Sequence, residues 1–173
     1  MKVARLVIAG VVGGAVAIGI IRAAGWAVGT DASLSAVLGA AVTGESGARA
    51  WSVGCAVQLG TAAIAALVYG GIFEWVTRRA GAAIGLAVAV PHVVIAGLAV
   101  GFLPGARMVE AGVLPPGAFF EYRGWIVLAA FIAAHLVFGV IVGVAYDGVP
   151  AGTPRGGRIW HETGLVGSRR GHD

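Results

Sequence analysis

Four apolar segments, each long enough to cross a lipid bilayer, dominate this chain of 173 residues. They cover residues 4–27, 51–76, 81–103 and 124–146. A helix needs about 20 apolar residues to cross the hydrocarbon core. Inside that core, every backbone polar group must be bonded within its own segment. The sequence therefore predicts an all-α integral membrane protein, a four-transmembrane-helix bundle in which residues 1–146 form one transmembrane domain.

The composition supports this class and argues against several others. The chain is 58% hydrophobic and 12% charged, and its charges lie mostly between the apolar segments. The net charge of +4 is therefore interpreted as membrane topology, because no basic face with interleaved aromatic residues indicates nucleic acid as a partner. The single cysteine, Cys55, excludes an intrachain disulfide. No sequence motif of a hydrolase, nucleotide-binding protein or metalloprotease occurs, so we do not expect an enzyme.

The positions of lysine and arginine predict the orientation in the membrane. Four of these residues fall on the side of the two long connections, namely Arg22, Arg49, Arg107 and Arg123. Eight fall on the opposite side, namely Lys2, Arg5, Arg78, Arg79, Arg155, Arg158, Arg169 and Arg170. The imbalance predicts a multi-pass protein with its N- and C-termini in the cytoplasm. The high content of alanine, glycine, valine and arginine favours a bacterial source, and hence the bacterial inner (plasma) membrane.

The segments outside the four spans have two characters. The two outer connections, 28–50 and 104–123, each contain a partly apolar stretch, "SLSAVLGAAV" and "ARMVEAGVL". Each stretch is predicted to form a short helix on the outer surface. Residues 147–173 are polar, glycine-rich and basic, and are predicted to form a cytoplasmic tail.

The two halves of the chain resemble one another. "LVYGGIFEW" in the second span and "LVFGVIVGVAY" in the fourth align with an offset of 69 residues, and the same offset superposes the two outer connections. This alignment indicates a tandem duplication of a two-helix hairpin, with a pseudo-axis along the membrane normal. The competing explanation is that a composition rich in glycine and alanine raises the identity by chance.

Small residues four positions apart recur in and beside the spans. Such spacing allows helices to approach closely in a membrane. The pairs are Gly10 with Gly14, Gly25 with Gly29, Gly81 with Gly85, Gly97 with Gly101, and Gly139 with Gly143. They predict a tightly crossed bundle, and the same faces could serve association with other membrane subunits or with a second copy of the chain.

Two histidines, His92 and His135, lie near the middle of the third and fourth spans. An ionisable residue inside a membrane span is a functional candidate because burying it is costly. The two spans are consecutive and antiparallel, so both imidazoles are expected at the same depth. Gly139 and Gly143 follow His135 at four-residue steps on the same stripe of the helix.

The pair allows three interpretations. His92 and His135 could be metal ligands that hold a b-type haem, with Gly139 and Gly143 making room for the ring as part of the cofactor-binding site. They could instead contact a quinone or another small molecule. In the third interpretation, which we favour, each histidine makes a hydrogen bond across the bundle and no cofactor is bound. The glycines then mark close helix contacts.

These observations predict a structural or accessory role, as a subunit or partner of a larger membrane assembly in the lipid bilayer. The alternative is electron transfer through a bis-histidine haem b or a quinone. A transporter is disfavoured because the middle parts of the spans carry no aspartate, glutamate, lysine or arginine.

Overall fold

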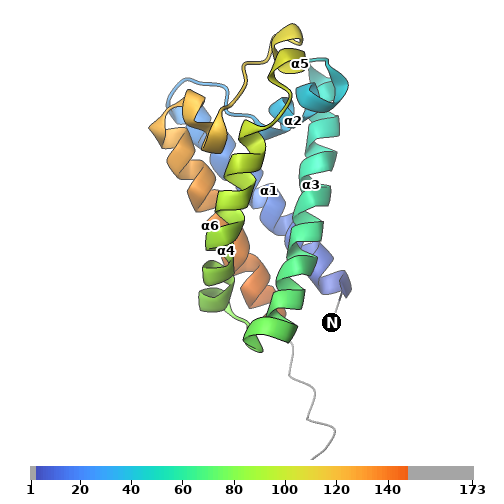
Figure 1. The fold of residues 1–173 in the computed structure, drawn as a ribbon, viewed down its shortest axis with the longest axis vertical. Helices are drawn as coiled ribbons and strands as arrows, with labels where there is room; N and C mark the ends of the chain where they lie inside the picture. Colours follow the sequence, from blue (N-terminus) through green and yellow to red (C-terminus); the bar gives the residue numbers. More distant parts are fainter. Residues whose placement is uncertain (1–2, 148–173) are drawn as a thin grey trace, which may run out of the picture.

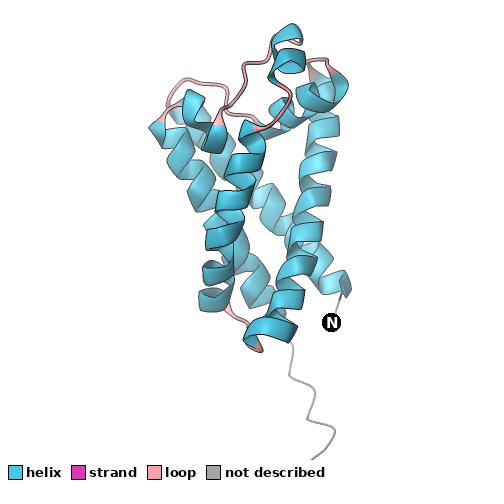
Figure 2. Ribbon diagram, in the orientation of Figure 1, coloured by secondary structure: helices cyan, strands magenta, loops and turns pink. Residues whose placement is uncertain are grey.

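The computed structural model describes residues 3–147, and 83% of them are helical, with no strand in that range (Figure 2). Six α-helices occur in this part of the chain: α1 (Val3–Ala27), α2 (Leu34–Thr43), α3 (Ala48–Gly71), α4 (Ala82–Gly101), α5 (Gly105–Glu110) and α6 (Trp125–Asp147). A π-helical turn, Ile72–Thr77, extends α3, and a 3-10 segment, Ala118–Arg123, precedes α6. The basic tail predicted for 147–173 lies outside the described residues, apart from Asp147.

Four of these helices are long and apolar enough to cross a membrane. They are Val3–Ala27, Ala48–Thr77, Ala82–Gly101 and Trp125–Tyr146. The predicted spans agree with these bounds to within three residues at every end. The prediction of four apolar helices is therefore confirmed, and length and composition make the chain consistent with a multi-pass membrane protein.

The four long helices form an arc rather than a fully closed ring. Helix α1 packs against both α3 and α6, and α6 packs in turn against α4. Helices α3 and α4 follow one another in sequence but are not a closely packed pair. Figure 1 shows them standing apart toward the end of the bundle that carries α2 and α5. The bundle is thus closed on three sides and open along one seam.

Glycine produces the close contacts on the closed sides. On α1, a Cβ added to Gly10 or Gly14 would overlap Ala62 of α3. Between α4 and α6 the approach is backbone to backbone, because a Cβ added to Gly139 would overlap the carbonyl of Gly85. The amide of Gly81 also donates a hydrogen bond to the Gly143 carbonyl at 3.1 Å. Three of the five small-residue pairs thus lie where helices cross.

The other two pairs serve local packing instead. Gly25 lies against Thr30 and Ala32 of the following loop, and Gly29 has a φ of 67° in the turn after α1. Gly97 accommodates the Phe119 ring, and Gly101 lies against Ala118. Their spacing therefore does not mark a helix–helix contact.

The two short helices predicted in the outer connections are present as α2 and α5. Helix α2 begins at its N-cap Ser33, whose hydroxyl accepts a hydrogen bond from the Ala36 amide at 3.1 Å. It does not simply lie on the surface, because six of its ten residues are buried. Gly39 and Gly54 allow α2 to cross α3 with the two backbones in contact. Helix α2 therefore covers the N-terminal end of α3.

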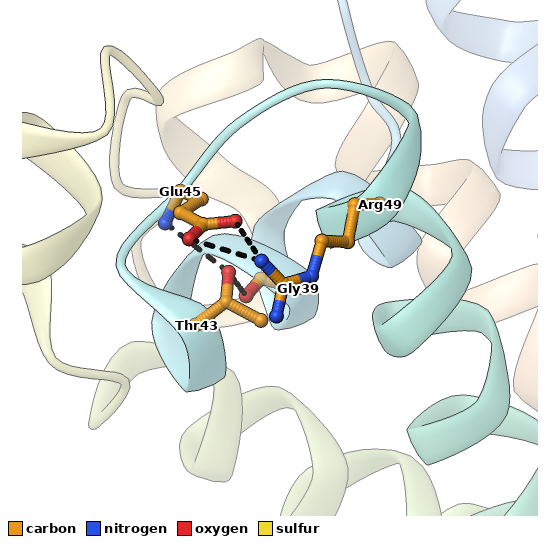
Figure 3. Close-up of polar contacts among 4 residues, drawn as sticks. All are labelled: Gly39, Thr43, Glu45 and Arg49. Atoms are coloured by element: carbon orange, nitrogen blue, oxygen red, sulfur yellow. Dashed lines mark hydrogen bonds and ion pairs between the residues drawn. The ribbon is translucent and has the colours of Figure 1, made fainter.

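The turn from α2 to α3 is held by local polar contacts (Figure 3). The Thr43 hydroxyl donates to the Gly39 carbonyl at 2.8 Å and accepts from the Glu45 amide at 3.1 Å. Arg49 approaches the Glu45 carboxylate at 3.4 Å with both side chains exposed, so this ion pair adds little stability.

The segment before α6 closes the bundle where α4 ends and α6 begins. Phe119 and Phe120 both have positive φ angles, 52° and 64°, which are uncommon for aromatic residues. Phe120 is fully buried and stacks on Phe131 of α6 with a centroid distance of 5.7 Å. At the opposite end of the bundle, the Tyr146 hydroxyl donates to Glu74 at 2.6 Å and ties α6 to the π-helical turn that extends α3.

Candidate functional site

A cavity of about 210 Å³ lies inside the arc of helices. Its wall is almost entirely apolar, with polar side chains at a few positions. Helix α1 contributes Gly14, Ala17 and Ile21, α2 contributes Leu34 and Leu38, and α3 contributes Val57, Gln58, Thr61, Ala62 and Ala65. The remaining lining residues, from α4 onward, are His92, Ala96, Ala99, Val100, Leu103, Phe131, His135 and Phe138. An apolar hollow with a few polar groups is typical of sites for small molecules.

The cavity opens at the seam between α3 and α4. Thr61 of α3 and Ala99 of α4 both line the cavity and are both exposed. They lie on the two helices that lack close mutual packing. The opening therefore faces sideways, toward the lipid that would surround the four long helices.

The two histidines lie side by side in this cavity. His92 and His135 are both half-buried, and their ring centroids are 5.2 Å apart with an interplanar angle of 77°. The two imidazoles are therefore close neighbours that meet edge to face. Whether they bind a ligand is not decided by their proximity and stays a prediction.

Each imidazole is fixed through its Nδ1 atom. The Nδ1 of His135 is 2.8 Å from the carbonyl of Phe131, one turn earlier on α6. The Nδ1 of His92 is 3.1 Å from the hydroxyl of Tyr69, which α3 supplies from across the seam. Tyr69 is only 3% exposed, so its hydroxyl depends on a protein partner. Within residues 3–147, neither Nε2 atom has a hydrogen-bond partner.

Aromatic rings surround the two imidazoles. Phe131 lies 4.3 Å from His135 between ring centroids, and Phe138 lies 5.5 Å from His92. Phe131, His135 and Phe138 share one face of α6, because they are spaced by four and three residues. Tyr69 adds an edge-to-face contact with His92 at 5.6 Å. These contacts hold both rings in a defined orientation.

A second polar group lies at the end of the cavity nearer α2. Gln58 accepts a hydrogen bond from the buried Ser35 hydroxyl at 3.1 Å through its Oε1, which leaves its amide N–H groups directed elsewhere. The lining residues of α3 run from Val57 to Ala65, which corresponds to a rise of about 12 Å. The cavity therefore follows α3 for about two turns, with Gln58 toward α2 and the histidine pair supplied by α4 and α6.

The contacts of Gly139 and Gly143 bear on the haem interpretation. Both glycines face the backbone of α4 and not the cavity, since a Cβ on Gly143 would overlap the Gly81 carbonyl. Two axial bonds to one iron would place the ligating nitrogens about 4 Å apart with a macrocycle between them. The two imidazoles instead contact one another edge to face. This arrangement does not fit a haem between His92 and His135 unless α4 and α6 separate.

Among residues 3–147, no group of three or more histidine, cysteine, aspartate or glutamate side chains could hold a metal ion.

Comparison of the chain with protein-family models, curated proteins and solved structures returned no match.

Sequence reasoning found the two histidines but missed the residues that orient them. The observed partners are Tyr69 and the Phe131 carbonyl. The requirement of a buried tyrosine hydroxyl for an acceptor was the available signal for Tyr69. The Phe131 carbonyl could have been found from its position four residues before His135.

Proposed function

We propose that this chain is a small multi-pass protein of a bacterial inner membrane with an accessory role, and that it holds a small, membrane-dissolved molecule between α3 and α4. The observation that carries the proposal is the laterally open cavity with an imidazole pair in its wall. In this proposal the chain is a partner or subunit of a larger membrane assembly, and the bound molecule links it to that assembly.

The cavity has the features that such a ligand requires. Its apolar wall suits a molecule that reaches the site from the lipid, because transfer from hydrocarbon to an apolar cavity sacrifices no hydration. Polar groups in an apolar pocket fix the orientation of a ligand and provide selectivity. His92, His135 and Gln58 are polar groups of this kind, and they belong to three different helices.

The arrangement in the membrane completes the proposal. The excess of lysine and arginine near the ends 2–5 and 78–79 favours a cytoplasmic location for the N-terminus, and the same reasoning places the C-terminus there. The opening of the cavity and helix α2 then belong to the outer half of the bilayer. The weak internal repeat is compatible with this layout, because α1 with α3 and α4 with α6 each form a hairpin whose long connection contains a short helix.

The test is to count the small molecules that accompany the protein. The chain is purified from its membrane in a mild detergent, extracted with organic solvent, and analysed by quantitative mass spectrometry. Two variants of α4 are purified in parallel. Ala99→Phe obstructs the opening, whereas Ala87→Phe adds the same ring at an exposed position of α4 outside the cavity.

We expect one class of small molecule at close to one copy per chain in the wild type and in Ala87→Phe, and severalfold less in Ala99→Phe. Bulk phospholipid should be retained equally by all three proteins. Equal recovery of every extracted compound from the three proteins would refute the proposal. A visible spectrum of the same samples, prepared with haem supplied, tests the haem alternative. If the wild type has a Soret band that is lost in both His92→Phe and His135→Phe, the haem alternative replaces this proposal.

A further inference from the structure

The hydrogen bond of His135 determines which of its nitrogens carries the proton. A carbonyl oxygen can only accept, so the contact of 2.8 Å with Phe131 requires an N–H at Nδ1. An isolated charge is costly to bury in apolar surroundings, which favours the neutral imidazole. In the neutral ring the Nε2 atom then carries the lone pair. His135 therefore offers the cavity an acceptor.

The hydrogen bond of His92 has the opposite consequence. Tyr69 is buried, and in the described part of the chain its hydroxyl has one partner, the Nδ1 of His92 at 3.1 Å. A buried O–H that donates to nothing would cost free energy, so the hydroxyl donates to Nδ1. That nitrogen must carry the lone pair, and the proton of the neutral ring is at Nε2. His92 therefore offers a donor.

The rings that carry this donor and this acceptor are neighbours, and both histidines line the cavity. The two rings are 5.2 Å apart between centroids, and no hydrogen bond joins them in the structure. Resting on the proposed function, we infer that the ligand ends in a hydroxyl group on a flat ring, as in a phenol or a quinol. One hydroxyl can donate to His135 and accept from His92 at the same time.

Other polar ends satisfy only part of this pair. A carbonyl or an ether oxygen accepts from His92 but leaves the lone pair of His135 without a donor. A primary amine is charged at neutral pH, and burying its charge in this apolar wall has a large cost. The hydroxyl is the smallest uncharged group that uses both imidazoles.

The shape and lining of the cavity select a ring with an apolar substituent. Its volume of about 210 Å³ is below the range of about 300–1,000 Å³ that accommodates drug-sized ligands, and suits a single ring with short substituents. Phe131 and Phe138 flank the imidazoles and provide edges and faces for aromatic contact. A longer alkyl or prenyl chain can leave through the seam beside Thr61 and Ala99 into lipid.

The inference is tested with redox-silent probes that differ only in their polar end, namely 4-decylphenol, its methyl ether 4-decylanisole, and decylbenzene. Binding to the protein in nanodiscs of one lipid composition is measured by competition. The preference is expressed as the ratio of dissociation constants between probes. Partition of each probe into the lipid is the same for every variant, so it cancels when ratios are compared between proteins.

We expect the wild type and Ala87→Phe to bind 4-decylphenol about 3- to 10-fold more tightly than 4-decylanisole. One additional hydrogen bond changes a dissociation constant by about this factor. His135→Phe lacks the acceptor, so the two probes should bind to it alike after correction for partition. Tyr69→Phe removes the contact that orients the His92 proton, and should lower the affinity for both probes. Circular dichroism confirms that each variant is folded.

The outcomes separate this inference from the proposed function. If all three probes bind the wild type with equal corrected affinity and Ala99→Phe abolishes their binding, the pocket stands and the hydroxyl specificity is refuted. A phenol preference that persists unchanged in His135→Phe also refutes it. If no probe binds the wild type, or if Ala99→Phe binds them as the wild type does, both the pocket and the inference are wrong. If a variant does not fold, the wild-type ratio, corrected for the partition of each probe into the same lipid measured without protein, decides the inference.

Discussion

Gly85 provides a test of the helix packing that is independent of any ligand. It lies on α4 where that helix crosses α6, and a Cβ placed there would overlap the carbonyl of Gly139 and come within 3.0 Å of the Gly143 Cα. Every atom in the way belongs to the backbone, so no side chain can rotate aside. The substitution Gly85→Ala therefore requires the two helices to separate.

The expected magnitude follows from two opposing effects. Overpacking a tight contact typically costs about 1–3 kcal/mol. Alanine is favoured over glycine in a helix by up to about 1 kcal/mol in water. At Gly19 of α1 the added Cβ has no atom within 4 Å, so only the favourable effect operates. We expect Gly85→Ala to lower the free energy of unfolding by about 1–3 kcal/mol, and Gly19→Ala to leave it unchanged or raise it slightly.

The assay is equilibrium unfolding in mixed micelles, in which SDS is titrated into a mild detergent and helix content is followed by circular dichroism. Both variants replace a glycine by an alanine within a long apolar helix, so they differ only in the atoms that surround the added methyl group. Equal changes in unfolding free energy for Gly85→Ala and Gly19→Ala would refute the close α4–α6 crossing.

Two further predictions concern the tyrosine–histidine contact and the orientation. Tyr69→Phe should lower the unfolding free energy by about 0.6–1.7 kcal/mol, the range for hydrogen bonds within membranes. In a protein that already carries His92→Phe, the additional change Tyr69→Phe should have little effect on the unfolding free energy. If the two changes in unfolding free energy simply add in the double variant, the direct hydrogen bond between Tyr69 and His92 is contradicted. In a Cys55→Ala background, an impermeant maleimide added to intact spheroplasts should label Glu110→Cys and not Arg79→Cys, because α5 is expected outside and the α3–α4 turn inside. Labelling of the two in the reverse pattern would invert the proposed topology.

The positions of the spans were accessible from the sequence because membrane insertion imposes length and composition directly. The depth match of His92 and His135 followed from equally simple geometry, since both lie near the middle of consecutive antiparallel helices. Their ring centroids are 5.2 Å apart. These properties depend on residue counts along single helices, which a sequence provides.

Features that depend on which helices pack together could not be obtained in this way. Gly97 and Gly101 have the same spacing as Gly139 and Gly143, yet one pair accommodates the segment before α6 and the other a neighbouring helix. The positive φ angles of Phe119 and Phe120 have no glycine or asparagine to indicate them. The burial of α2 likewise depends on its crossing with α3. That crossing needs Gly39 of α2 and Gly54 of α3, and no residue spacing along a single helix reveals such a contact.

The position of the cavity follows from the same distribution of small residues. Glycines allow α1 to approach α3 at Gly10, and α4 to approach α6 at Gly85. On α3, Gly60 has no atom within 4 Å of an added Cβ, so it closes no contact. The seam between α3 and α4 is instead bridged toward mid-bundle by Tyr69 and His92, whose side chains are long enough to meet across a gap. A seam bridged by side chains rather than by backbone contact leaves space beside the bridge. Tyr69, which fixes the orientation of His92, therefore also bridges the seam beside the cavity.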